Sequence, residues 1–164
     1  MEDLTHFNAS GNAVMVDVTE KSTTDRRAIA RCRVFISGGV PEREMEESLA
    51  VARVAGLSGA KWTSRLIPLC HSLPNVATTV TLSFEEGMVE IAAQSRTSSQ
   101  TGVEMEALTA CMVAALSVVS SLDGPSRTLV IDALELLDKR GGRSGHWARE
   151  RTAQGDERPL GLTP

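Results

Sequence analysis

The chain has 164 residues, of which 41% are hydrophobic and 23% charged, and this length and composition suit a single soluble globular domain. A net charge of −4 excludes the strongly basic surface of proteins that bind nucleic acid or anionic membranes. Aromatic residues make up only 3% and tyrosine is absent, so we expect a core of small aliphatic side chains.

The three cysteines, Cys32, Cys70 and Cys111, are widely spaced and odd in number. This pattern indicates reduced thiols, and no cysteine pair has the spacing of a metal site. The acidic, polar start of the chain is unlike a signal peptide, and no apolar run approaches membrane-spanning length. We therefore expect a cytoplasmic domain without a metal, a cofactor or a membrane segment.

The first half of the chain begins with residues 1–24, which are rich in Asn, Ser, Gly and Thr and predict an extended arm. Apolar residues alternate from Arg27 to Ile36, with arginines on the other face, and this predicts a half-buried strand. Residues 42–60 follow a Gly-Gly-Val-Pro segment and predict a helix with an acidic first turn. Two prolines between Ile67 and Asn75 predict a loop.

The second half begins with apolar alternation over residues 76–84 and 88–97, which predicts a hairpin of two strands. Thr101 is expected to be the N-cap of a long helix, with Glu104 as its capping-box partner. A Gly-Pro pair ends this helix, and residues 128–137 predict the last strand.

The predicted order is strand, helix, strand, strand, helix, strand. This is the α+β, ferredoxin-like split βαβ arrangement, an antiparallel sheet with helices on one face. We expect one domain over residues 1–147 and a polar, flexible tail over residues 148–164. The uncovered face of such a sheet is available for oligomer formation.

Four side chains are candidates for chemistry: Cys70, His71, Glu106 and Lys139. Cys70 suits a nucleophile, although a small buried residue is the commoner use of cysteine. His71 follows Cys70 in the Pro-flanked loop and suits acid/base work, although a lone histidine is more often structural. Glu106 lies about 200° around the helix from Glu104, so it is the better candidate for a pocket, against the alternative of a solvated carboxylate. Lys139 opens a Lys-Arg-Gly-Gly-Arg run that suits phosphate binding or, equally, a mobile linker.

Several longer runs resemble segments of the cyclic pyranopterin monophosphate synthase (MoaC) family of molybdenum cofactor biosynthesis. Thr5–Asn8 and Met15–Lys21 are similar to its N-terminal signature. Leu66–His71 and Thr101–Ala110 are similar to its two most distinctive blocks, and Lys139–Gly145 is similar to its closing motif. The resemblance runs from about Leu4 to Trp147.

The resemblance implies a ferredoxin-like lyase that assembles as hexamers built from dimers, with active sites where subunits meet. It implies conversion of 3′,8-cyclo-7,8-dihydro-GTP to cyclic pyranopterin monophosphate with release of pyrophosphate. Carried over by position, the implied catalytic residues are His71, Glu106 and Lys139. The implied substrate-binding residues are Leu69, Cys70, His71, Met105, Glu106, Asp17, Lys21 and Arg26.

Four positions depart from the family's pattern, and one of them is Gln100, which stands where the resemblance implies a basic residue just before Thr101. Met45 and Asp123 stand where the resemblance implies lysines, and Ser120 stands where it implies a catalytic aspartate. Because a serine hydroxyl stays neutral at pH 7 without an activating partner, it does not replace a carboxylate base. Arg43 can supply a positive charge in place of one lysine, but a guanidinium is a poor proton donor.

Three readings follow from this pattern. The first is an active synthase in which Arg43 or a neighbouring subunit supplies the missing charge. The second is a catalytically impaired homologue that binds the nucleotide or pterin precursor, or co-assembles with an active paralogue. The third is an oligomeric scaffold without a ligand, which leaves His71, Glu106 and Lys139 unexplained.

Overall fold

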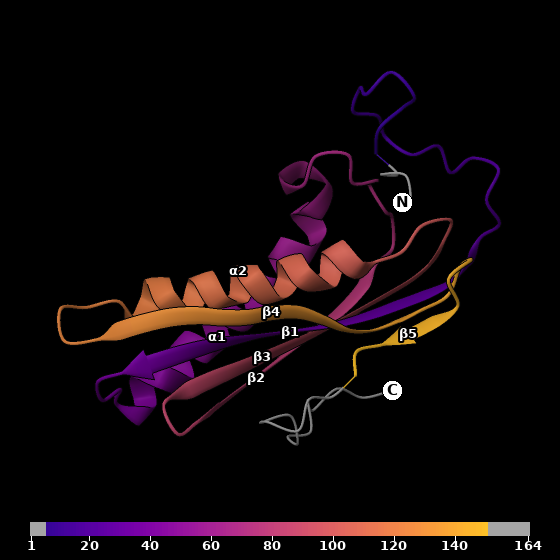
Figure 1. Ribbon diagram of the computed structural model, residues 1–164. Helices are drawn as coiled ribbons and strands as arrows, with labels where there is room; N and C mark the ends of the chain where they lie inside the picture. The colour runs from indigo at the N-terminus through magenta and orange to yellow at the C-terminus, as the bar shows by residue number, and fades with distance from the viewer. Residues whose placement is uncertain (1–5, 151–164) are drawn as a thin grey trace.

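A computed structural model describes residues 6–150 of the chain (Figure 1). Its elements, in chain order, are β1 (Thr24–Ser37), α1 (Glu42–Leu66), β2 (Ala77–Glu85), β3 (Met88–Ser99), α2 (Glu104–Leu122), β4 (Thr128–Arg140) and β5 (His146–Ala148).

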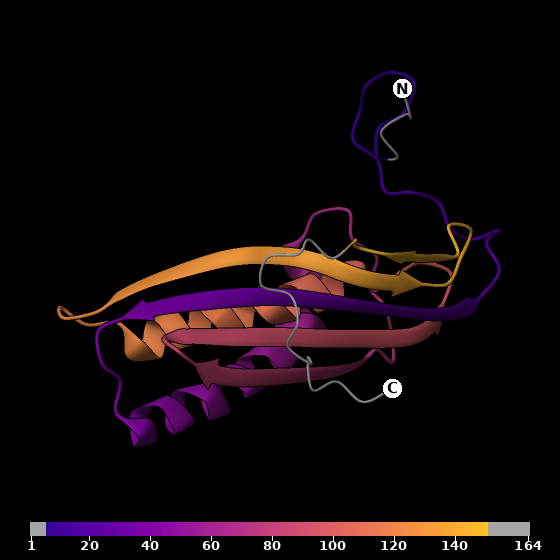
Figure 2. The same ribbon diagram turned by 60° about the horizontal axis from the view of Figure 1, so that its bottom comes forward.

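The strands form one antiparallel sheet in the order β2-β3-β1-β4-β5. Figure 2 looks onto the open face of this sheet, with both helices behind it. The order of the first four strands and the placement of the helices on one face confirm the predicted α+β, ferredoxin-like arrangement.

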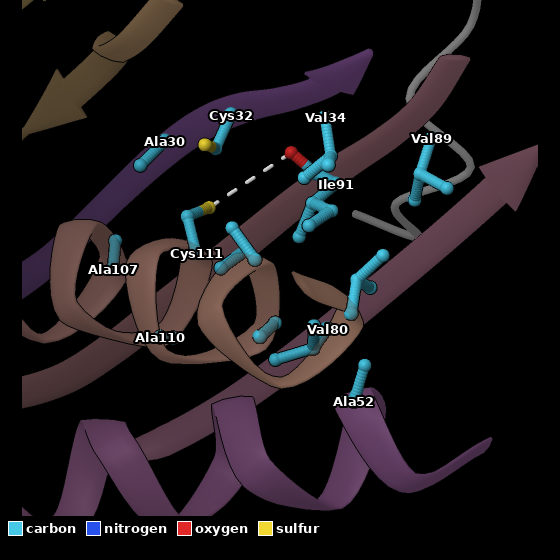
Figure 3. Close-up of a cluster of buried hydrophobic side chains, with 14 of the residues drawn as sticks. Ala30, Cys32, Val34, Ala52, Val80, Val89, Ile91, Ala107, Ala110 and Cys111 are labelled. Carbon is cyan, nitrogen blue, oxygen red and sulfur yellow. Dashed lines mark hydrogen bonds between the residues drawn. The ribbon is translucent and has the colours of Figure 1, made fainter. Parts of the chain in front are cut away.

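The core lies between the sheet and the helices and is made of small side chains, as the composition predicted. Alternate residues of β1, including Ala30, Cys32 and Val34, face α2, where Ala107 and Cys111 are fully buried (Figure 3). The Cys111 thiol points at the carbonyl of Ile91, 3.9 Å away. All three cysteines are free thiols. Burial raises the pKa of Cys32 to about 11, so this thiol stays protonated at neutral pH.

The two helices approach closely because α1 presents glycines to α2. A Cβ atom added at Gly56 would lie 2.9 Å from the carbonyl oxygen of Ala110, and one added at Gly59 would lie 2.8 Å from Cβ of Val113. Neither position has room for a side chain. The glycines therefore let the backbones of α1 and α2 approach closely at this contact.

Several boundaries differ from the predicted ones. Helix α1 continues to Leu66, and β4 continues to Arg140. The predicted capping box is wrong, because the N-cap of α2 is Val103 and no side chain caps it. The predicted tail begins inside structure, since Ala148 ends β5 and the backbone N–H of Arg149 donates to the carbonyl of Leu137 at 2.8 Å. The rest of that tail, residues 151–164, lies outside the described residues.

Helix α2 corrects the expectation that no apolar run approaches membrane-spanning length. An 18-residue window within its 19 residues has a mean hydropathy of 1.7, so by length and composition the helix could cross a membrane. Half of the helix is buried inside the fold, where it packs on the sheet and on α1. A core helix of a two-layer domain has this same character.

Candidate active site

Segments far apart in the sequence meet at one end of the helical layer. They are the loop after α1, the approach to α2, the end of β4 and the N-terminal arm, which rises beside that loop in Figure 1. Two hollows open there. The loop pocket, of about 330 Å³, is lined by residues that include Leu69, Cys70, His71, Glu104 and Met105. The basic groove, of about 920 Å³, is lined by residues that include Lys21, Arg26, Lys139 and Arg143.

The loop pocket and the basic groove share a wall made of Thr101 and Gly102. The two hollows therefore adjoin each other at these residues. Seven of the predicted site residues line one or the other: Leu69, Cys70, His71, Met105, Lys21, Arg26 and Lys139.

The loop that carries His71 contains a tight turn. The backbone N–H of Cys70 donates to the carbonyl of Ile67 at 3.3 Å, and Leu69 has a φ of 61°. Because Pro68 holds its own φ near −65°, this is the geometry of a type II turn, in which glycine normally takes the position of Leu69. A bulky residue in the left-handed region costs about 1–3 kcal/mol and is often found at functional sites. The turn presents Cys70 and His71 to the loop pocket.

The N-terminal arm holds the His71 ring through a hydrogen bond. Its Nε2 lies 2.8 Å from the carbonyl oxygen of Val16, which is 55 residues earlier in the chain. The ring is only partly buried and lines the loop pocket, so it remains accessible to a ligand. His71 is thus fixed in orientation while one side of the ring faces the pocket, as an acid/base group requires.

Cys70 is a poor nucleophile in this setting. Burial raises the pKa of its thiol, and the carboxylates of Glu106 and Glu104 raise it further. The thiol is therefore the form present at neutral pH. Cys70 forms part of the pocket wall.

The two glutamates of the first turn of α2 have separate surroundings, as their angular spacing predicted. Glu104 is partly exposed, and one carboxylate oxygen lies 3.6 Å from Nζ of Lys139. Glu106 is only 3% exposed and lines a third cavity, of about 480 Å³, together with Lys61.

Burial raises the pKa of Glu106, and the charge of Glu104 raises it further. Among residues 6–150, no group hydrogen-bonds its Oε2. A carboxyl group that is easily protonated and faces a cavity can hold or pass a proton. The Ala60–Lys61 run resembles part of the family's first helix, but this resemblance alone does not predict that Lys61 lines the same cavity as Glu106.

Arg26 is fastened beneath the glycine loop that follows β4. Its Nε donates to the carbonyl of Ser99 at 3.3 Å, and Nη2 donates to that of Gln100 at 3.1 Å. Gly142 has a φ of +71°, and a Cβ atom there would collide with Nη1 of Arg26. The absence of a side chain at this position therefore lets the guanidinium lie against the loop, where its charge contributes to the basic groove.

Asp17 lies in none of the three hollows just described. Its Oδ1 accepts hydrogen bonds from the backbone N–H of Thr19 at 2.9 Å and from the Thr19 hydroxyl at 2.8 Å. These bonds lower the pKa of Asp17, so the carboxylate stays ionised. The geometry gives Asp17 a part in shaping the arm.

Met45, Ser120 and Asp123 lie at the other end of the helices. Met45 is buried in the core at 4% exposure, whereas Ser120 and Asp123 are exposed. The 19 residues of α2 separate this end from Glu104 by about 28 Å at 1.5 Å per residue. Arg43, also at this end, is exposed and pairs with Glu47 at 2.9 Å. Within one subunit these residues do not meet the loop pocket.

In the part of the chain that the structure describes, no group of three or more His, Cys, Asp or Glu side chains could hold a metal ion. The groups available for chemistry at this site are the acid/base and cationic side chains described above.

Comparison with known proteins gives a consistent result. The sequence model of the MoaC family matches residues 15–142. The cyclic pyranopterin monophosphate synthase of Chloroflexus aggregans is 45% identical over 164 residues, covering 93% of this chain and 98% of that protein. Those of Thermomicrobium roseum and Rhodopirellula baltica are 48% and 41% identical, covering 92% and 89% of this chain and 95% and 93% of theirs. The chain belongs to the MoaC family.

Proposed function

We propose that this chain is a cyclic pyranopterin monophosphate synthase of molybdenum cofactor biosynthesis, a cytoplasmic lyase that acts on 3′,8-cyclo-7,8-dihydro-GTP. The observation that carries the proposal is the wall that the loop pocket shares with the basic groove. The substrate combines a purine-derived ring with a triphosphate, and the two adjoining hollows suit these two parts.

The basic groove suits the triphosphate. A cyclic monophosphate forms when an internal hydroxyl oxygen attacks the α-phosphorus and the bond to the leaving pyrophosphate breaks. Lys21, Arg26 and Lys139 line the groove and would stabilise the negative charge that grows on the leaving group. A neighbouring base must take the hydroxyl proton.

The ring rearrangement needs groups that give and take protons. His71 lines the loop pocket, and its imidazole ring can both give and take a proton. Glu106 has a raised pKa and lines a cavity that shares Leu73 with the loop pocket, and from there it would serve as a protonated acid. Lys139, paired with Glu104 between the two hollows, would support either step. Leu69, Cys70 and Met105 would shape the pocket around the ring.

The proposed enzyme is a homo-oligomer, a hexamer built from dimers, and acts on a small molecule without nucleic acid or membrane. Support comes from the separation of the two ends of α2, about 28 Å apart by helical rise. Ser120 and Asp123 can approach a loop pocket only if that pocket belongs to a neighbouring subunit.

A second candidate is a catalytically impaired homologue that binds the same precursor or co-assembles with an active paralogue. One observation favours it: Met45 is buried in the core and carries no charge, and Ser120 is an exposed, neutral hydroxyl. Arg43→Ala separates the candidates further. If Arg43 of a neighbouring subunit supplies the missing charge, the variant loses activity; if the chain is impaired, it changes nothing.

The test uses purified full-length protein and the carbon-bridged GTP derivative, with pyrophosphate release and binding heat measured in parallel. His71→Gln should reduce turnover by about 10²–10⁴-fold, the usual contribution of an acid/base group. His146→Gln is the matched control, because His146 is exposed on β5 and pairs with Asp138 at 2.5 Å. Binding without turnover in the unaltered chain would favour the impaired homologue, and absence of both would contradict the proposal.

A further inference from the structure

We propose that the arm segment Val16–Thr19 is a positioning device that fixes which ring nitrogen of His71 carries the proton. The proposal rests on the proposed function for its catalytic consequence. Its structural content, the tautomer of His71, stands on geometry alone.

The first step is the chemistry of the contact between the arm and the ring. Nε2 of His71 lies 2.8 Å from the carbonyl oxygen of Val16. A carbonyl oxygen only accepts hydrogen bonds, so Nε2 must be the N–H donor. In the neutral ring the lone pair is then on Nδ1, which becomes the atom that can accept a proton.

The second step is what holds the Val16 carbonyl in place. Asp17 follows Val16 directly, and its Oδ1 accepts both the backbone N–H and the hydroxyl of Thr19, at 2.9 and 2.8 Å. This Asx turn restricts the backbone on the far side of the Val16 carbonyl. The ionised state of Asp17 strengthens both hydrogen bonds.

The third step is the attachment of the turn to the domain. The side-chain Nε2 of Gln100 donates to the carbonyl of Thr19 at 3.3 Å. Gln100 itself lines the basic groove, and its own carbonyl accepts from Arg26 at 3.1 Å. The segment is thus held at one end by His71 and at the other by a residue beside the groove.

The consequence for the reaction is a defined path for one proton. A proton leaving the substrate would pass to the lone pair on Nδ1 of His71 and give an imidazolium. The Nε2–H bond to Val16 stays in place during that step, and its acceptor oxygen stabilises the positive ring. Asp17 is therefore a positioning residue that acts through Val16.

The experiment reads the tautomer directly. Nitrogen-15 NMR of the full-length protein, recorded above the pH range in which histidines titrate, distinguishes a protonated ring nitrogen from one with a lone pair. The spectrum of His71→Gln assigns the signal among the three histidines. We expect Nε2–H and a bare Nδ1 in the unaltered chain. The opposite tautomer, or an even mixture, would overturn the proposal whether or not the protein turns over.

Two substitutions at Asp17 separate positioning from direct contact with substrate. Asp17→Asn keeps an Oδ1 acceptor for Thr19, whereas Asp17→Ala removes it. Asp17→Ala should lose the single tautomer and reduce kcat by about tenfold with little change in KM, a part of what a general base contributes. Asp17→Asn should restore both. If it instead matches Asp17→Ala in kcat while keeping the tautomer, the charge of Asp17 acts on the substrate and the positioning role is wrong.

Discussion

Nζ of Lys139, at the end of β4, lies 3.6 Å from a carboxylate oxygen of Glu104 in the first turn of α2. The pair joins the sheet to the helix at the boundary between the loop pocket and the basic groove. Each side chain is about a third exposed, at 31% and 32%, so the pair adds little to stability.

This geometry predicts that loss of the Lys139 charge changes stability little but lowers activity strongly. Lys139→Gln should change the free energy of unfolding by less than about 1 kcal/mol, as exposed pairs do. The same change should lower turnover by about 10²-fold or more, because a charge facing a phosphate is lost. Urea denaturation and initial rates of pyrophosphate release measure the two effects. Arg53→Gln, on the exposed face of α1, is the control and should alter neither. A large loss of stability in Lys139→Gln would mean that the residue is structural.

The glycine loop supports the groove by leaving room for Arg26. Gly142→Ala should displace the guanidinium and raise KM about tenfold, the effect of losing one charge-assisted contact. Gly145→Ala is a matched control: Gly145 also has a positive φ, +65°, but no atom of the described residues lies within 4 Å of an added Cβ. Both variants should lose about 1 kcal/mol from backbone strain. Equal KM values in the two variants would show that Arg26 does not need this space.

The close contact between α1 and α2 predicts that Gly59→Ala destabilises the protein. Helix propensity alone predicts the opposite. Gly59→Ala places a methyl group 2.8 Å from Cβ of Val113, which cannot swing away. We expect a loss of about 1–3 kcal/mol in the free energy of unfolding, typical of overpacking. An uncrowded glycine in a helix would instead gain about 1 kcal/mol on the same change. Thermal and denaturant unfolding decide the sign, and a gain would mean that the helices lie further apart.

Glu106 predicts a pH dependence of stability. Its pKa in the folded state is raised by burial, so folding favours the neutral carboxyl. The stability that this form supplies is complete below the ordinary glutamate pKa and is lost as pH rises through the higher folded pKa. Glu106→Gln should therefore be more stable than the unaltered chain at neutral pH and less pH-dependent, while losing activity. Unfolding curves recorded from below the ordinary glutamate pKa up to neutral pH test this prediction, and identical pH profiles for the two chains would contradict a carboxyl group whose pKa is raised by burial.

Much of the fold could be predicted because alternation is a local signal. Every second residue from Ala28 to Ile36 is apolar and buried on the helix-facing side of β1, and this alternation alone orients the strand. The three-residue β5 could not be predicted, because its register comes from pairing with Asp138, Lys139 and Arg140 and its own sequence is short. The Thr101–Glu104 capping box failed because α2 begins at Glu104 with Val103 as its N-cap, so Thr101 lies two residues before the cap position.

The sequence predicted which residues belong to the candidate site better than how those residues contact one another. Sequence runs identified His71, Met105 and Lys139, which the fold brings to adjoining hollows. The bond between His71 and the Val16 carbonyl was not predictable, since a backbone acceptor leaves no trace in residue type. The sequence grouped Asp17 with the site, whereas the structure shows its carboxylate bonded to Thr19 within the arm.

The most direct measurement is the product balance of the unaltered, full-length protein incubated with 3′,8-cyclo-7,8-dihydro-GTP. The account predicts that pyrophosphate and the oxidised, fluorescent pterin appear in equal amounts and continue to accumulate beyond one equivalent of enzyme. A chain that binds this compound yet releases neither product would contradict the assignment of synthase activity.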